Sequence, residues 1–201
     1  SFFESNDLES IQIDIKMKYL LKIKSKRDQA LSQGFLQSSD EDFVPANILL
    51  NGKNVECKMR LKGDLPDHWA GDKWSFRIKV SKGNKIFGMS RFSLQRPGTR
   101  QDTGQWLFLQ SLRNENLLAV DYQFVNLTLN GKKLGIYALE QHFTKEMLES
   151  QKKREGVIVS FDEYRYWNKK HPEHSSFTAN KMLQTSQLQS RNNNSIENSV
   201  L

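Results

Sequence analysis

The sequence has a single cysteine, no long hydrophobic run and none of the short motifs that mark common hydrolase or nucleotide sites. Cys57 has no partner within the chain, so an intrachain disulfide is impossible and a disulfide-stapled secreted domain is excluded. No segment approaches the roughly 18–20 apolar residues of a membrane-spanning helix. Walker and G-x-S-x-G motifs are absent as well. The charged residues are therefore the more informative feature.

Acidic residues are too few to balance the basic ones. The chain has 30 Lys and Arg against 23 Asp and Glu, which gives a net charge of +7 and a pI of about 9.4. This excess favours an anionic partner, such as a nucleotide, a nucleic acid, a membrane surface or an acidic peptide. The charge alone does not choose among them.

Apolar residues make up only 37% of the chain and are unevenly spread. They cluster between about Ile11 and Phe161, and the residues that follow are mostly polar. We therefore expect an ordered portion at 1–163 and a loop-like or disordered portion at 164–201. The chain begins at Ser1 rather than at Met, so we expect a fragment of a longer protein.

Hydrophobic periodicity predicts where strands and helices begin. Residues 11–17 alternate as in a half-buried strand, and helical spacing follows from Lys18 until a stop at Gly34. Two Asn-Gly pairs, Asn51–Gly52 and Asn130–Gly131, each lie between alternating runs and predict β-hairpins.

Later segments complete the predicted fold class. Helices are expected at 105–118 and 144–154, and a strand at 156–161. Few segments have the pattern of a βαβ unit. The order predicts an α+β fold built on a meander, a largely antiparallel sheet with flanking helices.

The stretch 59–80, MRLKGDLPDHWAGDKWSFRIKV, combines two basic strands with an acidic loop. Met59 and Leu61 alternate with basic residues in the first strand, as Phe76 and Ile78 do in the second. If the apolar faces pair, four cations share one surface and repel one another unless an anion or carboxylates lie among them. These cations are Arg60, Lys62, Arg77 and Lys79.

Three segments in this order resemble the CotH kinase family, the spore-coat-protein kinases and their bacterial relatives. They are an Arg-x-x-Gly strand end at Arg60–Gly63, KWSFRIK at Lys73–Lys79 and the hairpin NGKKLGIYALE at Asn130–Glu140. The resemblance covers roughly residues 11–163. It implies the N-terminal part of an atypical kinase-like fold. It also implies transfer of phosphate from ATP, with Mg²⁺, to Ser or Thr hydroxyls of a protein substrate.

The resemblance also implies a nucleotide site. Glu140 would pair with one of the lysines and hold it in place, as Lys–Glu pairs do in kinases. Asp64, His68 and Trp69 are possible loop contacts. The residues implied to bind nucleotide are Arg60, Lys62, Gly63, Lys73, Arg77, Lys79 and Glu140.

The chain departs from the family pattern late in the sequence. Nothing after Phe161 resembles the D-x-D segment that carries the metal-binding and catalytic acids, so those acids are expected beyond Leu201 and no metal ligand is assigned. We expect the chain as given to be inactive by itself. Lys62 also stands where many relatives have an Arg followed by a Ser-rich loop.

Other interpretations stay open. The basic face can be solvated surface, the loop aspartates can serve turns, Glu140 can form a structural ion pair, and Trp69 can tuck onto the sheet beside an exposed His68. The whole protein can be a non-catalytic scaffold or pseudokinase at the cell surface or envelope. A nucleic-acid or polyanion binder is disfavoured, because the aromatics lie on apolar faces. The expected location is bacterial, cytoplasmic or tethered to the envelope by a segment upstream of Ser1.

Overall fold

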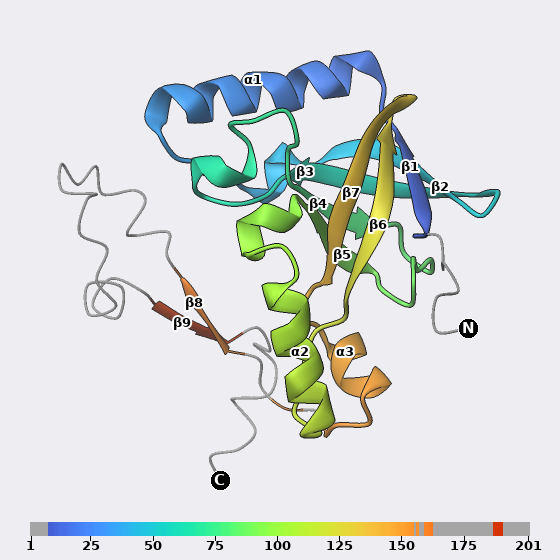
Figure 1. Cartoon of the computed structure of the whole chain (residues 1–201). Coiled ribbons are helices and arrows are strands. Elements are labelled where there is room, and N and C mark those ends of the chain that lie inside the picture. The colour runs from blue at the N-terminus through green and yellow to red at the C-terminus, as the bar shows by residue number, and fades with distance from the viewer. Residues whose placement is uncertain (1–7, 155, 157–158, 163–186, 191–201) are drawn as a thin grey trace, which may run out of the picture. The chain divides into compact units, whose positions relative to one another are not determined.

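The computed structural model describes residues 8–154, 156, 159–162 and 187–190, and the chain divides into two compact units (Figure 1). The first unit is Ser1–Gln151 and the second is Lys152–Leu201. In the second, β8 (Val159–Asp162) pairs antiparallel with β9 (Gln187–Ser190). Strand β9 falls within the stretch expected to be loop-like, and the rest of that stretch lies outside the described residues.

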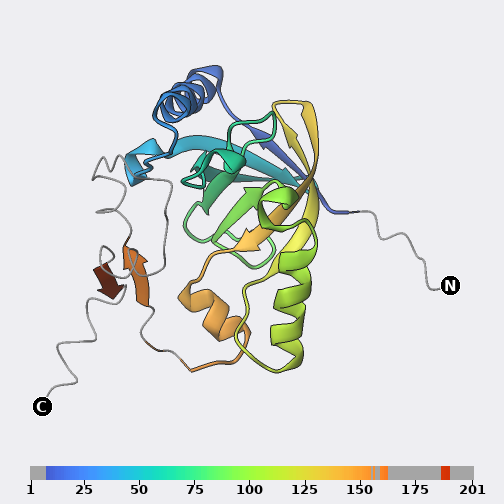
Figure 2. The same ribbon diagram turned by 60° about the vertical axis from the view of Figure 1, so that its left-hand side comes forward.

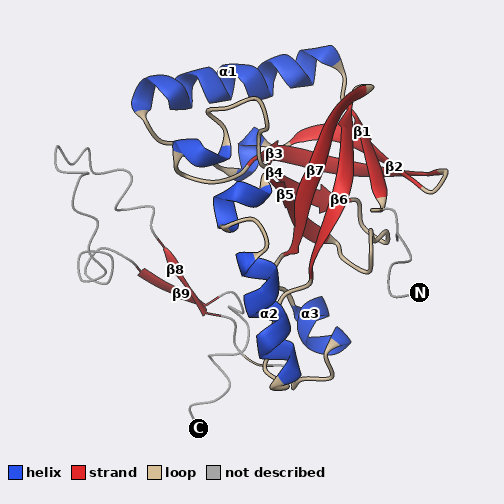
Figure 3. Cartoon of the chain, in the orientation of Figure 1, coloured by secondary structure: helices blue, strands red, loops and turns tan. Residues whose placement is uncertain are grey.

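The first unit is a closed barrel of seven strands in the order β1-β2-β3-β4-β5-β7-β6 (Figure 3). The expected α+β layout, a sheet with flanking helices in the manner of a kinase N-terminal part, is therefore wrong. The strands are β1 (Ser10–Asp14), β2 (Val44–Leu50), β3 (Lys53–Leu61), β4 (Phe76–Val80), β5 (Arg91–Gln95), β6 (Tyr122–Leu129) and β7 (Lys132–Gln141).

The barrel closes through one parallel seam. Strand β1 pairs antiparallel with β2 on one side and parallel with β6 on the other, from Ser10 opposite Asn126 to Ile13 opposite Leu129. Closure leaves no unpaired sheet edge among these strands. Hydrophobic alternation identifies the inward face of each strand but not its partner, so the seam could not be read from the sequence.

Alternate residues of every strand fill the interior. Ile13, Ile48, Ile78, Phe92 and Leu94 are each fully buried. Both Asn-Gly hairpins are confirmed, because Asn51 and Gly52 at one tip and Asn130 and Gly131 at the other all have positive φ. That backbone belongs to the two-residue turn whose twist matches paired strands.

The α-helices of the described residues, α1, α2 and α3, lie outside the barrel (Figure 2). Helix α1 (Met17–Gln33) ends at Gly34, whose φ of 78° confirms the predicted stop. Helix α2 (Gly104–Asn114) is confirmed but ends four residues before the expected Leu118, and α3 (Lys145–Ser150) is also shorter than expected. Among the described residues no helix has the length and apolarity to cross a membrane.

Candidate functional site

The four strand cations lie around the outer face of the barrel at β3 and β4. Arg60 is opposite Arg77, and Lys58 is opposite Lys79. Their neighbours Met59 and Ile78 point into the core. Strands β5 and β7 extend this outer face, because Arg77 is opposite Ser93 and Ser93 is opposite Glu140.

Lys62, which directly follows β3, is the most buried of these cations. Its Nζ donates to Oε2 of Glu140 at 2.6 Å and to Oε1 of Gln95 at 2.6 Å. The residue is 8% exposed, and Gln95 is completely buried. The end of β3, the end of β5 and β7 therefore each supply one member of a cluster that we call the Lys62 cluster: Lys62, Gln95 and Glu140.

Burial and nearby charges act in opposite directions on Lys62. Burial lowers the pKa of its ammonium, the Glu140 carboxylate raises it, and the positive charges of Arg77 and Arg100 lower it further. The net pKa lies below the ordinary value for lysine. An added anion near the cluster would raise the pKa of Lys62 and so act against the effects of burial and of the two arginines.

The loop after Lys62 is built around Gly63. Its φ is 92°, and a Cβ there would lie 2.2 Å from the ring of His68. His68 Nδ1 lies 3.0 Å from Ser75 Oγ, and Trp69 Nε1 donates to the Gly63 carbonyl at 3.0 Å. Any side chain at position 63 therefore strains the backbone and clashes with the His68 ring.

His68 and Trp69 pack inside the loop rather than along its surface. Trp69 has no exposed surface and His68 is 8% exposed, so the interpretation with an exposed His68 is wrong. Burial lowers the pKa of His68 and favours its neutral form. Neither ring is presented for stacking on a ligand in this structure. Asp64, the third possible loop contact, is exposed.

Helix α1 holds the other side of the same loop. Arg27 donates from Nε to the Trp69 carbonyl at 2.7 Å and from an Nη atom to the Ala70 carbonyl at 2.8 Å. Its guanidinium also lies 4.8 Å from the centre of the Trp74 ring. The loop is thus fixed by a helix that is distant in sequence.

The remaining cations of β3 and β4 have partners of their own. Lys79 Nζ lies 3.0 Å from both carboxylate oxygens of Asp40, and its hydrogen bonds, aided by its positive charge, lower the pKa of that carboxyl. Lys79 and Arg60 both lie over the ring of Phe43, and Arg77 hydrogen-bonds His142. Protein groups therefore already offset much of the repulsion predicted for this face.

Lys73 lines a different hollow. Its Nζ lies 3.4 Å from the Ile136 carbonyl oxygen. With Arg96, Phe124 and Ile136 it borders a cavity of about 670 Å³ next to β6 and β7. The structure thus brings Lys62 and Glu140 together and leaves Lys73 outside their cluster.

The sequence profile of the family described as CotH kinase protein matches residues 59–200. The chain belongs to the CotH kinase family. No curated protein matches the chain significantly. The matched region begins one residue before Arg60 and includes the whole Lys62 cluster.

The donor groups of this CotH-family chain fit a phosphate better than a metal ion. A lysine ammonium has three N–H donors, and two of those on Lys62 have partners. The described residues supply no acceptor for the third N–H of Lys62. Within the described part of the chain, no three His, Cys, Asp or Glu side chains gather as metal ligands, so Mg²⁺ is assigned to no residue.

Three functional candidates in this CotH-family chain were missed from the sequence. Gln95 ends β5, and nothing in its own segment indicated Lys62 as a partner. Asp40 stood in an apparently ordinary polar turn 39 residues from Lys79. Nothing local in the sequence connected His142 to Arg77. Only the folded barrel brings these side chains to the cations.

Proposed function

We propose that this chain is the nucleotide-binding part of a CotH-family protein kinase, which transfers the γ-phosphoryl group of ATP to a Ser or Thr hydroxyl of a protein. The single observation that carries the proposal is the buried Lys62–Glu140 pair at 2.6 Å within the matched family region. A buried lysine held by a glutamate is the arrangement with which kinase sites orient a phosphate-contacting cation.

Each member of the cluster has a separate task in this proposal. The Lys62 ammonium donates its third N–H to a phosphate oxygen. Glu140 favours the charged form of that ammonium against the effect of burial, and Gln95 accepts a second hydrogen bond from it. Phosphoryl transfer depends mainly on positioning and on stabilising charge on the phosphate oxygens, so a preoriented cation is an effective contribution.

Gly63 is expected to allow the approach of the phosphates. It directly follows Lys62 and is partly exposed, and its positive φ turns the chain there while the His68 ring fills the space where a side chain would project. Arg77 and Arg100 add positive potential at the same place. The loop glycine and these arginines therefore extend the cluster toward solvent.

A thermal shift titration with ATP tests this proposal. A ligand at about ten times its Kd stabilises by about 1.4 kcal/mol, which raises the melting temperature of a domain of this size by about 3 °C or more. We expect that rise for the unmodified chain and its loss in Lys62→Met. Lys79→Met is the matched control, because Lys79 is a strand cation already paired with Asp40.

Two results would contradict the proposal. One is no shift for any variant at millimolar ATP. The other is an equal shift in the unmodified chain and in Lys62→Met. Either result would make the Lys62 cluster a structural ion pair and favour a non-catalytic scaffold.

A further inference from the structure

The N-terminal half of α1 carries a concentration of positive charge that the nucleotide site does not use. Six basic residues lie between Lys16 and Arg27, and the first acidic residue after them is Asp28. The helix runs along the outside of the barrel, with Ile23 and Ala30 buried on its inner side (Figure 1). Its remaining faces are turned toward solvent.

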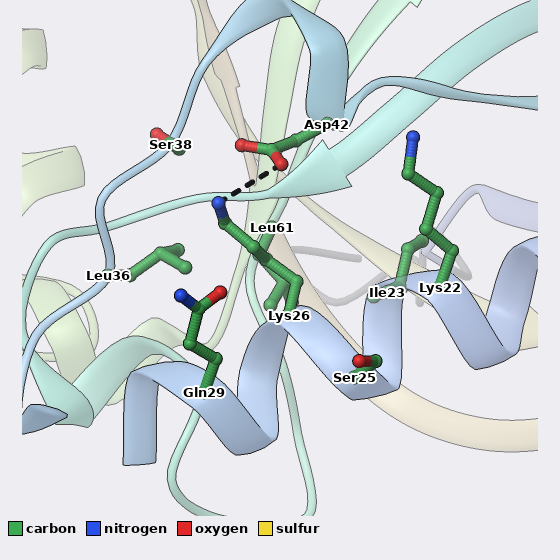
Figure 4. Close-up of a pocket in the computed structure, with 9 residues that line it drawn as sticks. All are labelled: Lys22, Ile23, Ser25, Lys26, Gln29, Leu36, Ser38, Asp42 and Leu61. Carbon is green, nitrogen blue, oxygen red and sulfur yellow. Dashed lines mark ion pairs between the residues drawn. The ribbon is translucent and has the colours of Figure 1, made fainter. Parts of the chain in front are cut away.

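The basic residues of α1 divide into two groups. Lys22 and Lys26 contact the turn that precedes β2. Lys22 donates to the Glu41 carbonyl at 2.9 Å, and Lys26 pairs with Asp42 at 3.2 Å (Figure 4). Lys16, Lys18 and Lys24 are exposed, and none forms an ion pair within the described part of the chain. Lys18 Nζ lies 4.8 Å from the centre of the Tyr19 ring, a contact that leaves its charge without a counter-ion, so the second group can pair with an external anion.

A second segment brings further lysines to the same end of the helix. The Asn130 side chain accepts from the Ile15 amide at 2.7 Å and donates to the Ile15 carbonyl at 2.9 Å. These bonds fix the tip of the β6–β7 hairpin beside the start of α1. Lys132 and Lys133, both exposed, follow directly after that tip. Figures 1 and 2 both show the hairpin tip close to this end of the helix.

Two large apolar side chains lie among these lysines. Met17 is 64% exposed and Leu21 is 55% exposed. They are four residues apart in α1 and so lie one above the other on the same helix face. Lys18 and Lys24 are their close neighbours on the helix surface. An exposed apolar pair within a cationic surface is typical of contact with a lipid interface.

This arrangement is unfavourable for the isolated domain. Lys16 is the N-cap of α1, and the first turn has no acidic residue and no side-chain cap. Positive charge at a helix N-terminus opposes the helix dipole, and clustered lysines repel one another. An anionic surface placed against the helix would reverse both effects.

We propose that this surface, made up of Lys16, Met17, Lys18, Leu21, Lys132 and Lys133, docks on a membrane that contains anionic lipids. The lysines would lie at the phosphate groups, and Met17 and Leu21 would enter the acyl boundary. Nucleic acid is a poorer fit, because Tyr19, the aromatic in this half of α1, packs against the core instead of offering a stacking face. The inference is independent of the proposed phosphotransfer.

Vesicle flotation with the full chain tests the docking. The two probes are phosphatidylcholine vesicles with about one third phosphatidylglycerol and vesicles of phosphatidylcholine alone. Removal of three lysines from an anionic surface lowers the partition coefficient on the order of 100-fold. We expect that loss in Lys16→Gln/Lys18→Gln/Lys132→Gln, and a smaller loss in Met17→Ser/Leu21→Ser. Neutral vesicles should bind the chain weakly.

The matched control removes the same charge elsewhere. Lys53, Lys82 and Lys85 are exposed and lie toward the other end of the barrel. The β2–β3 tip with Lys53 is at the Ser10 end of β1, and the chain leaves β4 toward that same end, because Val80 is opposite Cys57. Lys53→Gln/Lys82→Gln/Lys85→Gln should retain most of the binding, and melting temperatures should confirm that all variants fold.

Several outcomes would overturn the docking proposal. They are absence of binding to anionic vesicles, an equal loss in the control triple variant, or binding that Met17→Ser/Leu21→Ser leaves unchanged. Binding of a single-stranded oligonucleotide in place of vesicles, lost with the same three lysines, would assign the surface to nucleic acid instead.

Discussion

At the scale of single residues, the Lys62 cluster is costly for the fold. A buried ion pair recovers only part of the free energy spent in removing both charges from water, and apolar replacements of similar size are often as stable. Lys62 and Glu140 have side chains that are only 10% and 19% exposed. A cluster that costs stability in this way is better explained by binding than by folding.

The first prediction compares single and double replacements in this pair. Glu140→Gln leaves the buried ammonium without its counter-charge and should lower the free energy of unfolding by about 3 kcal/mol. Lys62→Met/Glu140→Leu removes both charges and should recover most of that loss. Urea denaturation measures both values. A double variant as unstable as Glu140→Gln would show that the pair is primarily structural.

The second prediction concerns pH and His68. Because burial lowers the pKa of His68 in the folded state, the unfolded chain binds a proton at this residue more readily. The stability that His68 contributes is therefore present above the pKa of the unfolded chain and is lost as the pH falls toward the lower folded pKa. His68→Gln should flatten the fall in unfolding free energy between pH 7 and pH 5. An unchanged slope would contradict this assignment.

The sequence could predict the kind of contact at the site and the residues Lys62 and Glu140, but not that these two pair with each other. The family resemblance indicated that Glu140 pairs with a lysine, and the structure shows that this lysine is Lys62. Gln95 and Asp40 could not be found, because nothing local connects either residue to its partner. Contacts of this kind depend on which strands become neighbours.

At the scale of elements, local signals were reliable where the backbone has few choices. The Asn-Gly turns and the glycine that ends α1 were predicted correctly, since positive φ is accessible mainly to Gly and Asn. The loop between β3 and β4 was harder. Its shape depends on Gly63, on the packing of Trp69 and on Arg27 from a distant helix.

The third prediction tests whether Arg27 of α1 stabilises this loop. Arg27→Ala removes two hydrogen bonds to loop carbonyls, which should ease local opening by about 2 kcal/mol and speed amide exchange at Trp69 and Ala70 roughly 30-fold. Lys24→Ala, on an exposed part of the same helix, is the control. Equal exchange in all three proteins would mean that the loop is fixed by its own packing.

At the scale of the whole molecule, closure of the barrel depends on the pairing of β1 with β6, which could not be predicted from the sequence. Parallel pairing of β1 with β6 joins segments more than 100 residues apart, as the 115-residue separation of Ile15 and Asn130 illustrates. Most strands of the barrel were visible as alternating runs. A closed sheet and an open one use the same alternation, so the fold class was predicted wrongly while most elements were predicted correctly.

The fourth prediction uses Cys57 to report on closure. Cys57 is 3% exposed, and burial raises the pKa of its thiol to about 12. At pH 8 the folded chain should therefore react with a thiol reagent only through opening of the barrel. Ile13→Ala leaves a cavity at the parallel seam. It should lower the free energy of unfolding by about 2–4 kcal/mol and raise the labelling rate at least 30-fold.

The control for that experiment is Leu49→Ala, which truncates a side chain that is 36% exposed on the adjacent strand β2. Its labelling rate should change little. Fast reaction of Cys57 in the unmodified folded chain would contradict a closed and stable barrel.

The central claim is that Lys62 contacts the phosphates of a bound nucleotide, and an acyl-phosphate derivative of ATP tests it most directly. An amine next to the phosphates attacks the acyl carbon of the probe, becomes acylated and releases ATP, and mass spectrometry identifies the modified lysine. The lowered pKa of Lys62 favours this reaction. The account predicts acylation of Lys62, suppressed by excess ATP and weaker at Lys73 and Lys79. Labelling that avoids Lys62, or that excess ATP does not suppress, would contradict it.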